Sequence, residues 1–254
     1  MQPNFLFDLD QTLLNFHASE ERALEIISKK YGLDYSKDKY AHFKAYNKSL
    51  WLELEKGSIS RKELFALRFT DFIAQCKGES LGLNPLMINE EFIVTMSQNG
   101  VLMDGAKEFV KRLKETIEGC RIYIVSNGAT VNANGRIKST GLDKYLDGIF
   151  VSEAMGVAKP SKKFFDIVLD TIGAEKESCI VIGDSLTSDI AGAQNAFIDS
   201  LWFMPQVEST SSIESEMKKY DVDYCASSFN ETYDILKKWS GEKNGIILQN
   251  PYCI

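Results

Sequence analysis

Histidine is scarce in this chain: His17 and His42 are the only two among 254 residues, and they stand far apart. A zinc site built from several histidines is therefore excluded. Cysteine occurs five times, an odd number, at scattered positions and without a Cys-x-x-Cys pair. Such spacing predicts reduced thiols in a cytoplasmic protein and no disulfide framework.

Long hydrophobic runs and basic clusters are also missing. No apolar run approaches the roughly 20 residues needed to span a bilayer, and the N-terminus lacks the basic-then-apolar pattern of a signal peptide. The formal net charge is −7, and lysine and arginine form no long run. We therefore expect neither a membrane nor a nucleic-acid polymer as a partner. A Gly-x-x-x-x-Gly-Lys-Ser/Thr loop is absent, which argues against a P-loop kinase.

Strands and helices alternate along the chain from Val101 onward, a pattern that predicts a parallel sheet. The length allows one large α/β domain or a core with a smaller domain. The predicted strands of this part are 121–125, 148–151, 179–182 and 200–203, and the predicted helices are 106–116, 162–172, 190–195 and 231–239.

The first predicted strand, Phe5–Phe7, is followed by a long helical stretch before any second strand begins. Apolar residues recur at helical spacing there, and Ser60 ahead of Glu63 is typical of a helix N-cap. A helical block at this position is an insertion, which we interpret as a cap. The expected domains are a core of 1–15 with 99–240, a helical cap of 16–98 and a C-terminal tail of 241–254. Docking of the tail on the core and pairing with a sheet edge both stay open.

Polar residues follow three of the predicted buried strands. In an open α/β sheet, chemistry gathers just beyond the carboxyl ends of the strands. A carboxylate beside a divalent cation can attack phosphorus, and a neighbouring carboxyl group can protonate the leaving oxygen. Aspartate is also common in turns and in the first turns of helices, and most lysines are solvated. The candidates are Asp8 and Asp10, Ser126 with Asn127 and Gly128, Lys159 before Pro160, and Asp184 with Asp189.

These four pieces, in this order, resemble the haloacid dehalogenase superfamily of phosphohydrolases. The pattern is Asp-x-Asp-x-Thr after the first strand, Ser or Thr after the second, a lysine, and an acidic pair after the fourth. The match extends from Asn4 to about Phe203. It implies a doubly wound, mostly parallel, Rossmann-like α/β core with an inserted helical cap, and a Mg²⁺-dependent phosphomonoesterase.

The resemblance also implies a role for each candidate. Asp8 corresponds to the nucleophile that forms an aspartyl-phosphate, and Asp10 to the general acid and base. Ser126, Asn127 and Gly128 would bind the phosphoryl group, with Lys159 supplying positive charge. Mg²⁺ would be held by Asp8, Asp184 and the backbone carbonyl of Asp10, with Asp189 supporting the site directly or through water.

The helical cap resembles that of the pyrimidine 5′-nucleotidase group, in segments 46–51, 55–60 and 67–69. This likeness implies a small phosphorylated metabolite as the partner, and specifically a nucleoside 5′-monophosphate. Phe16 could stack on a base, as aromatic side chains do elsewhere. Asn47 and Arg68 are polar residues on otherwise packed faces, so we expect them to face the substrate. For Trp51, lining a pocket and packing in the helix bundle are both open.

Competing interpretations differ in what they require. A dehalogenase needs neither the second acid, Asp10, nor a metal ligand such as Asp184. A phospho-switch module would not be expected to carry its acceptor on the first strand or to have an inserted cap. A phosphatase or phosphomutase for another small ester, such as a sugar phosphate, stays open, because only the cap would separate it from a nucleotidase.

Overall fold

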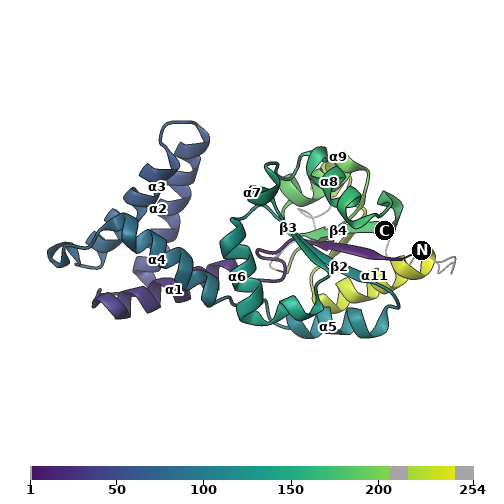
Figure 1. Ribbon diagram of the computed structural model, residues 1–254, viewed down its shortest axis with the longest axis horizontal. Coiled ribbons are helices and arrows are strands. Elements are labelled where there is room, and N and C mark those ends of the chain that lie inside the picture. The colour runs from purple at the N-terminus through teal and green to yellow at the C-terminus, as the bar shows by residue number, and fades with distance from the viewer. Residues whose placement is uncertain (1, 206–216, 244–254) are drawn as a thin grey trace. The chain divides into compact units, whose positions relative to one another are not determined.

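The computed structural model describes residues 2–205 and 217–243. The described chain divides into two units (Figure 1): a core formed by the residues up to Asn15 and from Val101 onward, and a helical unit, Phe16–Gly100, that we call the cap. The insertion begins at the predicted residue and ends two residues later than predicted. Of the predicted tail, 241–243 are the last residues of a helix, and 244–254 lie outside the described residues.

The core is built on a sheet of six strands in the order β3-β2-β1-β4-β5-β6, with every pair parallel (Figure 1). The predicted doubly wound sheet is thereby confirmed. The sixth strand was not predicted, because three residues are too few to show a pattern. The strands are β1 Asn4–Phe7, β2 Arg121–Ser126, β3 Gly148–Val151, β4 Cys179–Gly183, β5 Asp199–Phe203 and β6 Tyr224–Ala226.

Helices cover both faces of this sheet. The strand β1 has neighbours on both sides and is buried throughout, which explains why its apolar run is continuous. Phe5 and Phe7 point to one core cluster, and Leu6 points to the other. The core helices are α5 Ala106–Thr116, α6 Thr130–Thr140, α7 Ser152–Met155, α8 Lys162–Ile172, α9 Ala191–Ala196 and α11 Phe229–Lys243, with the short 3-10 helices η2 Leu142–Tyr145 and η3 Lys176–Ser178 and the short π-helix η4 Leu186–Ile190. Residues of α5, α6 and α11 complete the first cluster, and residues of α8 and α9 complete the second.

The cap has a hydrophobic core of its own, in which Phe43, Phe69, Phe72 and Phe92 pack ring against ring. The predicted N-cap at Ser60 is confirmed, and it forms a capping box with Glu63. Within the described ranges, no helix is long and apolar enough to cross a membrane. The cap helices are α1 Phe16–Tyr31, α2 Lys37–Glu55, α3 Arg61–Gln75 and α4 Pro85–Gln98, with a short η1 Glu79–Leu81.

Candidate active site

The carboxyl ends of β1, β2 and β4 lie side by side because these neighbouring strands are parallel. Asp8 follows β1 directly, and its N–H donates to the carbonyl of Ile182 at 2.8 Å, which continues the ladder one residue past the strand. Ser126 is the last residue of β2, and Asp184 follows β4. The topology therefore brings Asp8 to the same sheet edge as polar residues that lie more than a hundred positions later in the sequence.

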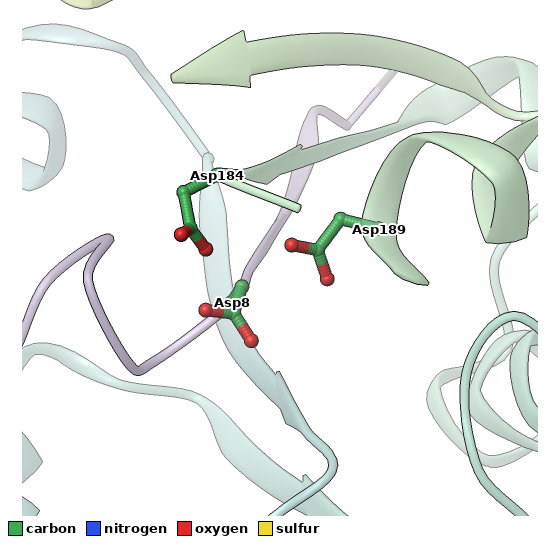
Figure 2. A group of neighbouring side chains, drawn as sticks. All are labelled: Asp8, Asp184 and Asp189. Atoms are coloured by element: carbon green, nitrogen blue, oxygen red, sulfur yellow. The ribbon is translucent and has the colours of Figure 1, made fainter. Parts of the chain in front are cut away.

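Asp8, Asp184 and Asp189 form one acidic group, with an oxygen of each within 4.8 Å of the others. Figure 2 shows their three carboxylates turned toward a common space. Asp189 comes from η4, and its Oδ2 accepts a hydrogen bond of 3.1 Å from the backbone N–H of Ser185. A side chain at Gly183 would place its Cβ 2.2 Å from Asp189 Oδ2, so glycine is required where β4 ends.

Lys159 connects two members of this group. Its Nζ donates to Asp8 Oδ1 at 2.7 Å, to Asp189 Oδ1 at 2.6 Å and to the carbonyl of Val125 at 2.6 Å. All three ammonium hydrogens are therefore used, which is what a lysine only 4% exposed requires. The side-chain amide of Asn127 donates to the carbonyl of Lys159 and accepts from its N–H, both at 2.9 Å. Asn127 thus fixes the backbone from which the ammonium extends.

The charges of the site do not balance. Burial raises the pKa of Asp8, the Lys159 ammonium lowers it and the Asp189 and Asp10 carboxylates raise it, and the net result is a pKa of about 8. Burial, together with Asp189, raises the pKa of Asp184 to about 6. Burial would lower the pKa of Lys159, but the carboxylates of Asp8 and Asp189 raise it above its ordinary value. Each carboxyl group would therefore gain from additional positive charge in the group.

Carboxylate oxygens are the ligands that a hard cation such as Mg²⁺ prefers. Asp8, Asp184 and Asp189 supply only such oxygens, without sulfur or nitrogen donors. A divalent cation would also offset the excess of three carboxylates over one ammonium. On donor type and on charge, this group fits Mg²⁺.

Asp10 stands apart from the acidic group. Its carboxylate forms a two-point ion pair with Arg136 of α6. Two residues after Asp10, Thr12 is fully buried, and its hydroxyl donates to Asp8 Oδ2 at 3.3 Å. The two predicted catalytic carboxylates thus have different partners: Asp8 has Lys159 and Thr12, and Asp10 has an arginine.

Ser126 and Gly128 lie at the end of β2. Ser126 is 2% exposed, and its Oγ accepts the N–H of Gly128 at 3.1 Å. The hydroxyl hydrogen is the donor with which Ser126 could bind a phosphoryl oxygen. The turn then leads into α6, whose first residue is Thr130.

The four predicted substrate residues of the cap have unequal surroundings. The Nε of Arg68 donates to Asn89 Oδ1 at 3.0 Å and its Nη1 to Asn47 Oδ1 at 3.3 Å, so α2, α3 and α4 are joined through one guanidinium. Arg68 is 5% exposed. Phe16 is half-buried against the hydrophobic core of the cap, whereas Trp51 is 37% exposed. Trp51 is therefore not buried in the helix bundle. Arg68 and Asn47 are hydrogen-bonded to each other within the cap.

Two buried charged residues were not predicted from the sequence. Arg136 is 2% exposed, and Glu20 of α1 is likewise 2% exposed. The signal in each case was a charge on an apolar helix face. Arg136 follows Ala133 by three positions and precedes Ile137, and Glu20 stands three and four positions before Ala23 and Leu24.

Comparison with known proteins agrees with this geometry. The model of the haloacid dehalogenase-like hydrolase family matches residues 4–196. The hydrolase YfnB of Bacillus subtilis is 32% identical over 80% of this chain and 84% of its own length. Its crystal structure, bound to magnesium, superposes with a TM-score of 0.75 and covers 92% of this chain and 98% of that one, at 29% identity.

Two further relatives have named activities. The pyrimidine 5′-nucleotidase PynA of Streptococcus pneumoniae is 34% identical over 79% of this chain and 83% of its own. The pyrimidine 5′-nucleotidase YjjG of Escherichia coli is 30% identical over 77% of this chain and 83% of its own. With the family model covering most of the chain and the strand-end carboxylates in place, this protein belongs to the haloacid dehalogenase-like hydrolase family.

Proposed function

We propose that this chain, a phosphoric monoester hydrolase of the haloacid dehalogenase-like family, releases inorganic phosphate from nucleoside 5′-monophosphates with Mg²⁺ as its cofactor. The observation that carries the proposal is the buried group formed by Asp8, Asp184, Asp189 and Lys159. It combines a nucleophilic carboxylate, a fixed cation and a set of oxygen ligands at the carboxyl ends of parallel strands.

In the first step, a carboxylate oxygen of Asp8 attacks phosphorus and the bond from phosphorus to the ester oxygen breaks. Asp10 gives a proton to the leaving oxygen, so that the nucleoside departs as an alcohol. Lys159 and the Ser126 hydroxyl bind the phosphoryl oxygens, whose charge would otherwise repel Asp8 and Asp184. The product of this step is an aspartyl-phosphate on Asp8.

In the second step, Asp10 removes a proton from water, whose oxygen attacks phosphorus and releases inorganic phosphate and the free Asp8 carboxylate. Asp8, Asp184, Asp189 and the backbone carbonyl of Asp10 would hold Mg²⁺. Such an ion, when bound, offsets the negative charge shared by carboxylates and phosphate. Lys159 stays charged throughout, because the Asp8 and Asp189 carboxylates raise its pKa.

The choice of a nucleotide rests on the relatives and on the cap. Two relatives of similar length are named pyrimidine 5′-nucleotidases. The core residues would bind only the phosphoryl group, so selectivity among esters must come from other side chains. Phe16 and Trp51 carry aromatic surface on which a base could stack, and such contacts are worth roughly 1–3 kcal/mol per base.

A phosphate-release screen tests the proposal. The wild-type protein, with and without Mg²⁺, is compared with Asp8→Asn on pyrimidine and purine monophosphates and on sugar phosphates. We expect repeated turnover that needs Mg²⁺, is highest with pyrimidine nucleotides and is lost in Asp8→Asn. Preference for a sugar phosphate would overturn the substrate class, and release of about one equivalent would indicate a phospho-switch instead of an enzyme.

A further inference from the structure

Arg136 is a charged side chain in an apolar position. It lies on the face of α6 that carries Ala133 and Ile137, both fully buried in the hydrophobic cluster under the sheet. Its side chain is only 2% exposed. Burying a guanidinium costs free energy unless it is paired and hydrogen-bonded, and an apolar residue of similar volume usually serves stability at least as well. The location therefore calls for a reason other than packing.

Arg136 pairs with Asp10 at two points of contact. One guanidinium nitrogen, Nη1, pairs with Asp10 Oδ1, and the other, Nη2, donates to Oδ2 at 3.0 Å. A guanidinium can donate to both oxygens of a carboxylate at once, which a single-point donor such as an ammonium group cannot do. Both carboxylate oxygens are held, so the plane of the carboxylate is fixed as well as its position.

The backbone of Asp10 forms a bridge with Leu14, but its side chain needs a further support. The side chain is 30% exposed, so packing alone does not hold it. It stands in a turn between β1 and α1, next to Gln11, whose φ of 62° lies in the left-handed region. A free Asp10 carboxylate could turn toward the acidic group, where it would add a fourth negative charge. In the structure it points to Arg136 instead.

We infer that Arg136 is the positioning residue for Asp10, and that it acts on turnover through this carboxylate. The inference rests on the proposed function, in which Asp10 exchanges a proton with the leaving oxygen and with water. Arg136 gives Asp10 a partner apart from the acidic group: Asp8 contacts Lys159, and Asp10 is held by the guanidinium. A lysine at this position would keep the charge but lose the fork.

A double-mutant cycle tests the inference. Arg136→Lys and Arg136→Met are made in the wild-type and in the Asp10→Asn protein. Lys138→Gln serves as the matched control, since it removes one positive charge from an exposed position of the same helix. The substrates are the best nucleotide of the screen and p-nitrophenyl phosphate, whose leaving group needs little protonation. Melting temperature and binding of beryllium fluoride with Mg²⁺, a phosphoryl mimic for Asp8, report on the fold and on the rest of the site.

We expect Arg136→Lys to lower kcat for the nucleotide about 10- to 100-fold, as loss of a supporting partner typically does. Arg136→Met should lose more, and both should lose less with p-nitrophenyl phosphate. In the Asp10→Asn protein, the same substitutions should lower kcat for the nucleotide less than about twofold, because the effects of residues that act as a unit are not additive. Beryllium fluoride binding should not change, and Lys138→Gln should match the wild-type protein.

Other results would overturn the inference. A full additional loss on top of Asp10→Asn would give Arg136 a role that does not pass through Asp10. Weaker beryllium fluoride binding in the Arg136→Lys variant would mean that the helix itself has shifted. If Arg136→Met does not fold, Arg136→Lys carries the test. Absence of phosphate release by the wild-type protein would overturn the proposed function, and the inference with it.

Discussion

The core and the cap each bury opposite charges, but they hold them differently. In the core, Lys159 contacts Asp8 and Asp189 directly, at 2.7 and 2.6 Å. In the cap, neutral groups bind each charge. Arg68 donates to two asparagine side chains, and Glu20 accepts the Tyr40 hydroxyl at 3.3 Å. Arg68 also lies over the rings of Phe65, Phe69 and Phe92.

The difference indicates two purposes. The core charges are in excess of one sign, and their pKa values are shifted by one another as well as by burial, which suits a site that binds an anion and a cation. The cap buries an acidic side chain, Glu20, and a basic side chain, Arg68. Burial raises the pKa of Glu20 to about 7 and lowers that of Arg68 to about 10. Their partners come from different helices, so this network joins the bundle.

Asp8→Asn is expected to give the largest effect, and it tests whether the charged residues of the core serve turnover and not stability. Asparagine keeps the shape, its one side-chain oxygen can still accept from Lys159, and its amide N–H can donate to the Thr12 hydroxyl, but it cannot attack phosphorus. We expect turnover of every ester to be abolished while the melting temperature does not fall, because one of three clustered negative charges is gone. Phosphate release and thermal melting measure the two effects. Activity within about tenfold of the wild-type protein, the scale of a lost minor contact, would sink the nucleophile assignment.

Arg68→Met should have the opposite profile. It removes the guanidinium that joins three cap helices and leaves the buried Asn89 side-chain oxygen without that donor, and a buried polar group left unsatisfied costs about 1–3 kcal/mol. We expect a large loss of stability in denaturant unfolding, with turnover of p-nitrophenyl phosphate little changed well below the melting temperature.

Arg22→Met, at an exposed position of α1, is the control for Arg68→Met. If both substitutions destabilise the protein equally, the contrast between the core and cap networks does not hold.

Much of the core could be predicted because each of its buried strands stops abruptly at a polar residue. The predicted helices 106–116 and 162–172 have the bounds of α5 and α8, and the predicted strand 148–151 has those of β3. Asp8 and Asp184 were placed by a simple rule: parallel strands bring their carboxyl ends to one edge.

The choice of partners by side chains could not be predicted in the same way. A polar residue on a packed helix face indicates that a partner exists, but not whether it is substrate, a neighbouring helix or a distant loop. Arg68 and Asn47 were predicted to face the substrate, and the structure pairs them with each other. Arg136 was missed, because its partner lies 126 positions away. Such pairings depend on tertiary contacts that periodicity does not encode.

A pH series separates the two networks further, through Glu20. In the unfolded chain this carboxyl ionises near pH 4.5, whereas in the folded chain it stays protonated up to about pH 7. Between these values the folded state binds more protons, so the free energy of unfolding falls as pH rises, and it levels off above about pH 7. Arg68, Tyr40 and Lys44 all favour the ionised form, but burial outweighs them.

Glu20→Gln should remove this dependence. Relative to the wild-type protein, its free energy of unfolding should increase by roughly 2–3 kcal/mol between pH 5 and pH 8, as two pH units of proton linkage require. Denaturant unfolding at both pH values measures this difference, with Glu25→Gln, an exposed site on the same helix, as the control. A difference that does not change with pH would show that Glu20 is ionised in the folded cap at both values.

The smallest expected effect concerns the aromatic residues of the cap, and it decides whether the cap does more than hold itself together. Trp51 is 37% exposed, so Trp51→Leu should change the melting temperature little. Phe16 packs against the cap core, so Phe16→Leu should lower it. If either ring stacks on a base, its loss should reduce kcat/KM for nucleotides about 5- to 150-fold, equivalent to roughly 1–3 kcal/mol, and leave a small alkyl phosphate unaffected. If the ratio of kcat/KM for nucleotides to kcat/KM for the alkyl phosphate is unchanged in both variants, the cap no longer supports a nucleotide substrate. The phosphatase chemistry of the core would not be affected by this result.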